Sequence, residues 1–290
     1  MLFITIYFSK NILLEIINLI KAFILMEENK SRENKPFALV TGSSSGIGYQ
    51  YARVMAERGY NLIMVSNEAD AIVEKADIIK KDFPVEAIPL CRDLGKQDSA
   101  KELYNTCIQN NWEVEVLINN AGVYHDKDFL KDTEAFNNLI LNLHVNTPAM
   151  LIYFFGQDMV KRHKGYILNM SSITSDIAVQ RLATYGATKC FLRNFSRSVH
   201  IELFTEGVNL TAVCPGAVAT DLYNISTKST KIGLKLGYII TPERLARKAV
   251  KAMFKGKSGI TPGWINPIGI FFIKLIPTGL LRFIRKKEIF

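Results

Sequence analysis

The sequence predicts one α/β domain built around a doubly wound parallel β-sheet. Two observations carry this prediction. Short apolar runs alternate with longer amphipathic stretches between Phe37 and Thr261, as in repeated βαβ units. A glycine-rich turn follows the first apolar run directly. With 290 residues, 48% hydrophobic and 22% charged, the chain can form one large core, and its composition excludes disordered, collagen-like and polytopic membrane classes.

Seven apolar runs are the expected strands, and six amphipathic stretches are the expected helices. We expect strands at residues 37–41, 61–66, 86–91, 114–119, 165–170, 209–214 and, more weakly, 259–261. We expect helices at residues 47–58, 69–81, 99–110, 133–161, 184–204 and 242–254. Ligands of such sheets bind beyond the carboxyl ends of the strands. Side chains that carry chemistry should therefore follow strands directly.

The net charge of +9 is concentrated near the C-terminus, because residues 228–290 hold 14 Lys and Arg against two Glu. No nucleic-acid recognition motif accompanies this charge, so no nucleic-acid partner is expected. The cysteines, Cys91, Cys107, Cys190 and Cys214, form no Cys-x-x-Cys pair and accompany no signal-peptide cleavage pattern, which indicates reduced thiols in a cytoplasmic protein. The four histidines are isolated, so each is interpreted as an ordinary surface or core residue and no metal is expected.

The residues from Thr41 to Gly48 read Thr-Gly-Ser-Ser-Ser-Gly-Ile-Gly and lie between the first expected strand and the first expected helix. The N–H groups and the dipole at a helix N-terminus bind pyrophosphate, and glycine is needed where a Cβ would block the turn or the ligand. Such a turn can also serve the backbone alone. By itself the motif is a moderate indication of a dinucleotide site.

Tyr185 and Lys189 are four residues apart in an expected helix and therefore lie on one face of it. A nearby ammonium favours the phenolate and lowers the pKa of a tyrosine, which suits the tyrosine to exchange a proton with an alkoxide. The same spacing also occurs where both side chains are merely solvated. Spacing alone leaves both interpretations open.

Six ordered matches make the region from about Lys35 to Thr261 resemble the short-chain dehydrogenase/reductase family, which implies a Rossmann-type sheet. The glycine turn is one match, and Tyr185 with Lys189 is another. The others are Asn-Asn-Ala-Gly at residues 119–122, Ser172 thirteen residues before the tyrosine, Asn146 in His-Val-Asn, and Pro215, Gly216 and Thr220 in Pro-Gly-x-x-x-Thr.

The resemblance implies a nicotinamide oxidoreductase in which Tyr185 is the general acid/base and Lys189 lowers its pKa while binding the nicotinamide ribose. It also implies that Ser172 hydrogen-bonds the substrate oxygen and that Asn146 holds a water linking Lys189 to solvent. Asn146 also has a structural interpretation, as a helix-kinking residue just before Pro148, and the two are compatible.

Nineteen residues are implied to bind the cofactor, with Asp93 expected at the adenine ring and Thr220 at the carboxamide. They are Thr41, Gly42, Ser43, Ser45, Gly46, Ile47, Gly48, Ser66, Asn67, Asp93, Asn120, Ala121, Gly122, Tyr185, Lys189, Pro215, Gly216, Val218 and Thr220.

The choice between NAD and NADP rests on the end of the second strand. NAD-specific folds usually place an acid there, which binds the ribose hydroxyls and repels a 2′-phosphate. Ser66 and Asn67 occupy that place, and the Arg or Lys that NADP users of the family often carry there or in the glycine turn is also missing. Small hydrogen-bonding residues tolerate a phosphate better than they exclude it. NADP is therefore expected, with NAD as the alternative.

We expect helical extensions at residues 1–34 and 263–290, on either side of a domain at residues 35–262. Lys10, Glu15 and Lys21 interrupt the first extension, so its amphipathic helix should lie on a membrane rather than cross it. Packing on the enzyme or on a partner subunit is the alternative. The basic, apolar second extension could contact anionic lipid or, with an expected loop at residues 217–238, cap the active site.

The predicted function is NADPH-dependent reduction of a lipophilic ketone, such as a steroid, a fatty-acyl or another long-chain carbonyl. A catalytically inactive nucleotide-binding regulator on the same fold is the alternative. The presence of Asn146, Ser172, Tyr185 and Lys189 together disfavours it. We further expect a homo-oligomer with peripheral contact to the cytoplasmic face of a membrane.

Overall fold

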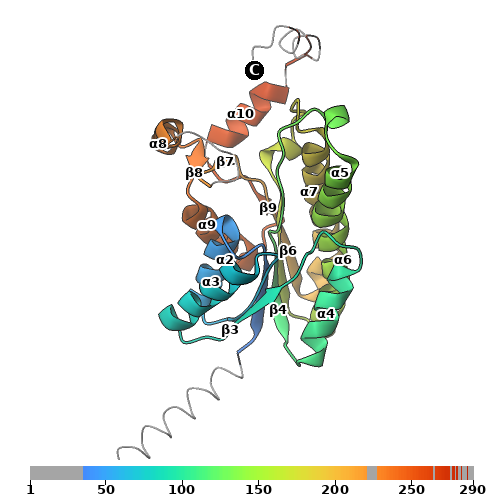
Figure 1. The fold of residues 1–290 in the computed structure, drawn as a ribbon, viewed down its shortest axis with the longest axis vertical. Helices are drawn as coiled ribbons and strands as arrows, with labels where there is room; N and C mark the ends of the chain where they lie inside the picture. The colour runs from blue at the N-terminus through green and yellow to red at the C-terminus, as the bar shows by residue number, and fades with distance from the viewer. Residues whose placement is uncertain are drawn as a thin grey trace, which may run out of the picture.

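Seven parallel strands form the central sheet in the computed structural model of the chain, which describes residues 35–220, 227–263 and 265–274 and a few isolated positions up to 286 (Figure 1). The strands are β1 (Phe37–Thr41), β2 (Asn61–Ser66), β3 (Ala87–Cys91), β4 (Val114–Asn119), β5 (Gly165–Met170), β6 (Val208–Val213) and β9 (Gly259–Ile260). Their order is β3-β2-β1-β4-β5-β6-β9. The predicted fold class is confirmed, and each strand lies within one residue of its predicted bounds.

Helices cover both faces of the sheet (Figure 1). One face carries α2 (Gly46–Glu57), α3 (Ala69–Asp82) and α9 (Pro242–Phe254). The other carries α4 (Ser99–Gln109), α6 (Thr147–Lys161) and α7 (Ala183–Leu203), with α5 (Glu134–Leu141) beside α7. Each face has its own apolar core, so the sheet is buried between two helical layers.

The strands β1, β2 and β4 are buried at every position. Alternate residues serve the two cores, because Ala38 and Val40 face the first core and Leu39 faces the second. A strand covered on both faces needs mostly apolar residues, which explains why apolar runs located the strands so closely. Truncation of the fully buried Leu39 to alanine should cost about 2–5 kcal/mol of stability.

The chain reverses its direction across the sheet at β1. From β1 it passes outward to β2 and β3, and then it crosses back to β4 on the other side of β1. Connections from the two neighbouring strands therefore leave in opposite directions and open a crevice at their carboxyl ends. The glycine turn after Thr41 and the turn at Asn120 both border this crevice.

The predicted helix at residues 133–161 is interrupted. A π-helical turn, η2 (Asn142–Asn146), separates α5 from α6. Pro148 has no N–H to donate to the His144 carbonyl, as an α-helix would require, and the wider turn accommodates this. By length and composition the stretch Glu134–Lys161 could cross a membrane, but Leu151 and Phe155 within it are buried in the second core, which explains its apolar character.

The segment predicted as a loop at residues 217–238 is more regular than expected. Strand β7 (Ala217–Val218) pairs with β8 (Ile239–Ile240), and helix α8 (Thr227–Leu236) lies between them. A Cβ on Gly233 would lie 2.4 Å from the Ile239 side chain, so this glycine lets α8 pack on β8. Two-residue strands and a short helix rich in Lys, Ser and Thr give no clear period.

Helix α10 (Ile265–Lys274) begins the predicted C-terminal extension and lies beyond the carboxyl edge of the sheet (Figure 1). The predicted N-terminal segment at residues 1–34 lies outside the described residues. The chain enters β1 at the amino edge of the sheet, opposite the edge that carries α10.

Candidate active site

A cavity of about 490 Å³ opens at the carboxyl ends of the strands, centred on the crevice between β1 and β4. Most of the residues predicted to bind a cofactor line it. These are Gly42, Ser45, Gly46, Ile47, Gly48, Ser66, Asn67, Asp93, Asn120, Ala121, Gly122, Tyr185, Lys189, Pro215 and Thr220. Residues distant in sequence thus meet at one edge of the sheet.

The glycines of the turn after β1 are required by close backbone approaches. A Cβ on Gly48 would lie 1.9 Å from the Gly42 carbonyl oxygen, and a Cβ on Gly42 would lie 2.8 Å from Ala121 Cα. Gly46 has φ +53°, and the nearest atom to a Cβ there is Thr220 Cγ2 at 3.7 Å. The turn is therefore packed tightly on the protein side and open toward the cavity.

The N-terminus of α2 faces this open side. Ser45 is its N-cap, but the Ser45 side chain makes no capping hydrogen bond within the described part of the chain. The first N–H groups of α2 and its dipole are then available to an anion. This arrangement fits a pyrophosphate, as the glycine pattern predicts.

Thr41 and Asn120 join the glycine turn to the turn after β4. Thr41 Oγ1 accepts hydrogen bonds from the N–H groups of Asn120 (2.9 Å) and Ala121 (3.0 Å), while Asn120 Nδ2 donates to the Thr41 carbonyl at 3.0 Å. Ser43 is fully buried, and its hydroxyl donates to the Val40 carbonyl. Thr41 and Ser43, predicted to bind cofactor, therefore support the cavity from behind rather than line it.

The end of the cavity at β2 holds a carboxylate that the sequence interpretation overlooked. Ser44 Oγ donates to Glu68 Oε2 at 2.6 Å, and the Ser66 hydroxyl lies 2.9 Å from Ser44 Oγ. The N–H of Glu68 in turn donates to Ser66 Oγ at 3.2 Å. Glu68 N-caps α3, one residue beyond Ser66 and Asn67 at the end of β2, so its carboxylate reaches the cavity from the start of the helix.

Arg92 lines the same end of the cavity. It follows β3, the strand paired with β2, and its main-chain N–H donates to the Ser66 carbonyl at 2.7 Å. Its side chain pairs with Glu102 of α4 at 2.5 Å. This end of the cavity thus contains both a cation and an anion where the sequence suggested neither.

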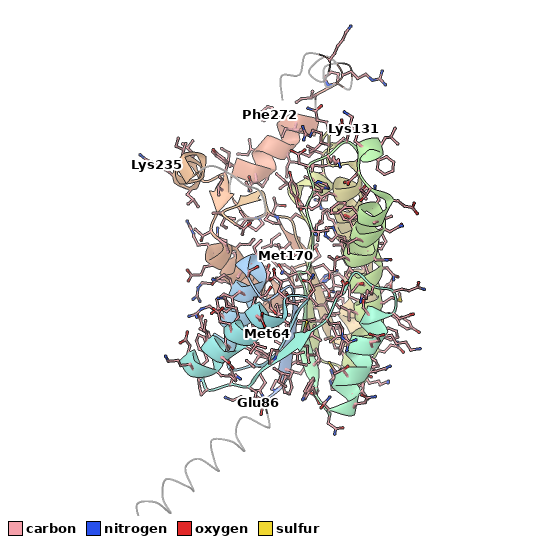
Figure 2. All side chains as sticks on the ribbon, viewed as in Figure 1. Met64, Glu86, Lys131, Met170, Lys235 and Phe272 are labelled. Carbon is pink, nitrogen blue, oxygen red and sulfur yellow. The ribbon has the colours of Figure 1, made fainter. Side chains whose placement is uncertain are left out.

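Tyr185 and Lys189 lie on one face of α7, as their spacing predicts, and both are buried. Lys189 Nζ donates to the Met170 carbonyl at 2.8 Å. Met170 is the last residue of β5 and is labelled near the centre of Figure 2. The ammonium lies 5.6 Å from the centroid of the Tyr185 ring. Burial lowers the pKa of Lys189 to about 8, so its charge is retained near neutrality and is lost under mildly alkaline conditions.

Ser172 lies beside the cavity lining rather than in it. It N-caps the 3₁₀ turn η3 (Ile173–Ser175), and its Oγ accepts a hydrogen bond from the Thr174 N–H at 3.2 Å. Its neighbour Ser171 lines the cavity, but that hydroxyl donates to the Lys189 carbonyl at 2.7 Å. Ser172 follows β5 and is buried, which keeps it at the correct edge of the sheet.

Asn146 does not lie with Tyr185 and Lys189, which corrects the sequence expectation. It is exposed and borders a separate pocket with Lys96 and Phe154. The π-helical turn places His144 in the cavity wall instead, where it is almost fully buried. The sequence signal for this was weak, because a single histidine without a nearby ligand partner is ordinarily a core residue.

The turn after β6 closes the side of the cavity opposite β2. Thr220 lines it, and Thr220 Oγ1 is buried without a hydrogen-bond partner among the described residues. Such an atom is expected to pair with a ligand. A Cβ on Gly216 would lie 2.7 Å from the Asn266 side chain, and Val218 is fully buried in β7. Gly216 and Val218 therefore shape the turn without lining the cavity.

The fold and this site define a dinucleotide-dependent oxidoreductase. Comparison with protein families matches residues 36–230 to the short chain dehydrogenase family. The chain belongs to this family, and its cofactor is a nicotinamide dinucleotide, NAD(P).

Relatives of known name cover most of the chain. It is 29% identical over 287 residues to the very-long-chain 3-oxoacyl-CoA reductase-B of Danio rerio. This match covers 95% of this chain and 88% of the relative. The chain is 28% identical to the hydroxysteroid dehydrogenase-like protein 1 of Gallus gallus, covering 79% and 68% respectively. Among solved structures, a bulky-bulky ketone specific alcohol dehydrogenase from Comamonas testosteroni matches with TM-score 0.70 and 26% identity, covering 79% of this chain and 86% of that one.

Proposed function

We propose that this protein reduces the carbonyl of a lipophilic 3-oxoacyl or related long-chain ketone to a secondary alcohol with NADPH. The observation that carries the proposal is the pairing of buried Tyr185 and Lys189 at the wall of a cavity that fits a dinucleotide. A reduced nicotinamide bound there supplies the hydride. The protein must then deliver one proton to the developing alkoxide.

Tyr185 is the proton donor in this proposal. Its hydroxyl transfers a proton to the substrate oxygen as the carbonyl carbon becomes tetrahedral. The Lys189 ammonium, held by the Met170 carbonyl, stabilises the phenolate that remains. Ser172, at the end of β5, would donate a hydrogen bond to the same substrate oxygen. Thr220 Oγ1, which is buried without a partner among the described residues, would hold the nicotinamide carboxamide.

The cavity end at β2 supports NADP as the cofactor, with NAD as the alternative. Ser44 and Ser66 offer hydroxyl groups, and Arg92, which carries a guanidinium, is one of the lining residues. Guanidinium and hydroxyl groups are suitable partners of a 2′-phosphate. Glu68 opposes the phosphate, so the preference for NADPH over NADH should be modest.

The substrate class is supported by the relatives' names and by the surface around the cavity mouth. Very-long-chain 3-oxoacyl-CoA reductases of fish and mammals are among the relatives. Large apolar side chains are exposed beyond the carboxyl edge of the sheet, from three separate segments. They are Phe129 and Leu130 of the turn η1 (Phe129–Lys131), Ile232 and Leu236 of α8, and Ile268, Phe271 and Phe272 of α10. A long acyl chain could lie along such a surface.

The same exposed apolar side chains also support a peripheral contact with the cytoplasmic face of a membrane. Lys131 and Lys235 lie at the same end of the molecule as Phe272, while Glu86 lies at the opposite end (Figure 2). Apolar side chains flanked by lysines suit an anionic lipid surface. In this proposal residues 35–262 form the enzyme, residues 263–290 contact lipid, and residues 1–34 add a second attachment. A homo-oligomer is proposed through exposed aromatic residues of the helical layer, such as Tyr153 and Phe191.

An activity series tests the proposed reaction. Purified protein is assayed with NADPH and with NADH against 3-oxoacyl-CoA thioesters of about 4 to 20 carbons. The longer chains can extend over the exposed apolar side chains near the cavity. We expect turnover that rises with chain length. Failure to oxidise NADPH with any of these ketones, together with measurable NADPH binding, would favour the alternative of a nucleotide-binding regulator.

Flotation with liposomes tests the membrane contact. Full-length protein should float with anionic liposomes at low salt and be released as salt rises, because the attraction is partly electrostatic. The double variant Phe271→Glu and Phe272→Glu should float less. A matched control, Ile201→Glu in the last turn of α7 with Phe204→Glu just after that helix, should float like the parent protein because both side chains are exposed away from α10. Full-length protein that stays in solution under all these conditions would contradict the membrane contact.

A further inference from the structure

His144 bridges two separate parts of the active-site wall. It comes from η2, and its Nε2 accepts a hydrogen bond from the N–H of Val123 at 2.9 Å. On the other side of the ring, Nδ1 lies 3.2 Å from Thr188 Oγ1. Val123 belongs to the segment that follows β4, whereas Thr188 lies on α7 between Tyr185 and Lys189 in the chain. The imidazole therefore ties the turn after β4 to the helix that carries the proton donor.

The hydrogen bonds assign one protonation state to this imidazole. The Thr188 hydroxyl donates its single proton to the Tyr185 carbonyl at 2.8 Å, so toward His144 it can only accept. The Nδ1 atom must then carry a proton, and Nε2 must be the acceptor for the Val123 N–H. Both bonds form together only in the neutral ring protonated on Nδ1.

The surroundings also oppose a charged ring. Burial and the nearby Lys189 ammonium lower the pKa of His144 well below its usual value. A second proton would sit on Nε2 and face the N–H of Val123. The ring is also closely packed, because a side chain on Gly122 would place its Cβ 2.8 Å from His144 Nε2. The site thus keeps a neutral, hydrogen-bonded ring in a fixed place.

The ring also borders the side chain of Tyr185. The centroids of the His144 and Tyr185 rings are 5.8 Å apart, with an interplanar angle of 74°. Tyr124 contacts Tyr185 in the same edge-on manner, at 5.4 Å and 81°. Because Tyr124 directly follows Val123, the bond from Val123 to His144 fixes this second contact as well. His144 is therefore linked to Tyr185 in three ways: by direct ring packing, through the Thr188 hydroxyl, and through Tyr124.

We propose that neutral His144 is a positioning residue that holds the Tyr185 hydroxyl in the geometry for proton transfer. This inference rests on the proposed role of Tyr185 as proton donor. A donor displaced by about 1 Å can lose about 100-fold in rate while the cofactor remains bound. Loss of the bridge should therefore lower kcat and leave the dinucleotide affinity nearly unchanged.

Three variants separate the two arms of the bridge. His144→Asn keeps a donor for Thr188 but is too short to reach Val123, and His144→Gln keeps an acceptor for Val123 but loses the Thr188 bond. His144→Ala removes both. We expect kcat to fall about 10- to 100-fold in the alanine variant and less in the other two, with the Kd for NADPH within about twofold throughout. The solvent deuterium isotope effect on kcat should rise in the alanine variant, because proton transfer becomes slower.

The assay uses full-length protein, NADPH and the ketone most rapidly reduced in the chain-length series. His163→Asn, an exposed histidine at the amino edge of the sheet, is the matched control and should behave like the parent protein. Tyr185→Phe is assayed in parallel. Full turnover by Tyr185→Phe would overturn the proposed function itself. An inactive Tyr185→Phe beside a His144→Ala variant with unchanged kcat and isotope effect would overturn only the positioning role. Equal losses in kcat and in NADPH affinity would also overturn it, since general damage to the site would then be the cause.

Discussion

Replacement of Glu68 by glutamine should strengthen NADPH binding more than NADH binding. In the structure the Glu68 carboxylate lies 2.6 Å from Ser44 Oγ at the end of the cavity beside β2. A 2′-phosphate that also bonded Ser44 would lie about 5 Å from this carboxylate. The charges are alike, so the carboxylate should weaken binding of the phosphorylated cofactor in particular.

The size of the effect follows from this separation. Glu68 is exposed, so the dielectric constant of water applies, and two unit charges about 5 Å apart repel by about 0.8 kcal/mol. A phosphate carrying nearly two charges about doubles this, and salt at physiological strength reduces it again to about 1 kcal/mol. Removal of the carboxylate should therefore tighten NADPH binding about fivefold. The Kd for NADH should change by less than about twofold, because glutamine can still hydrogen-bond a ribose hydroxyl.

Fluorescence titration of the bound dihydronicotinamide measures both constants. Glu74→Gln is the matched control, because it removes the same charge from an exposed position in α3, the helix that Glu68 caps, where Glu74 pairs with the neighbouring Lys75 at 2.7 Å. It should leave both constants unchanged. Equal tightening of NADPH and NADH in Glu68→Gln, or equal effects of the two variants, would refute the placement of the phosphate beside Ser44.

Three other outcomes follow from the site. Tyr185→Phe should abolish turnover with NADPH affinity retained within about twofold, whereas Lys189→Ala should damage both, as steady-state kinetics and titration would show. The rate of reduction should decline as pH rises through about 8, because Lys189 then loses its proton and with it the positive charge that stabilises the phenolate. In a Lys189→Arg variant the rate should stay constant to higher pH, because arginine keeps its charge. Gly48→Ala should abolish cofactor binding and lower the melting temperature, because its Cβ would lie 1.9 Å from the Gly42 carbonyl oxygen.

Each of these outcomes has a clear contradiction. A Tyr185→Phe enzyme with unchanged kcat would remove the tyrosine from the mechanism. A rate that stays constant between pH 7 and 10, roughly the span over which an amine of shifted pKa titrates, would show that the Lys189 charge is not needed. A Gly48→Ala protein with the parental melting temperature would mean that the turn after β1 can move away from the added methyl group.

The sequence located the strands well because the physical signal was strong. Buried parallel strands are mostly apolar, and this pattern can be recognised without knowing which strands are neighbours. The glycine turn and the Tyr185–Lys189 pair were equally readable, since each depends on local geometry. These features were sufficient to predict the sheet and most of the cavity lining.

The errors came from side chains whose placement depends on the third dimension. Asn146 and His144 are two residues apart, and the π-helical turn before Pro148 decides which of them faces the cavity. Glu68 was overlooked because its carboxylate reaches Ser44 from the start of a helix rather than from the strand end. Helix α8 was overlooked because it packs through Gly233 against a strand of only two residues. Short-range patterns contain little information about such contacts.

The strand order has a consequence for how this protein behaves at high concentration. Within the described chain, β3 and β9 are the outer strands of the sheet, and β9 has only two residues. The main-chain N–H of Leu62 donates to the Glu86 carbonyl, and that of Arg92 donates to the Ser66 carbonyl. In a parallel pair the residues alternate, so the main-chain groups of residues 86, 88, 90 and 92 point toward β2, and those of Pro89 point away from the sheet. A proline there offers no donor to an incoming strand. The β3 edge therefore offers fewer hydrogen-bonding groups to a second sheet, which disfavours edge-to-edge stacking.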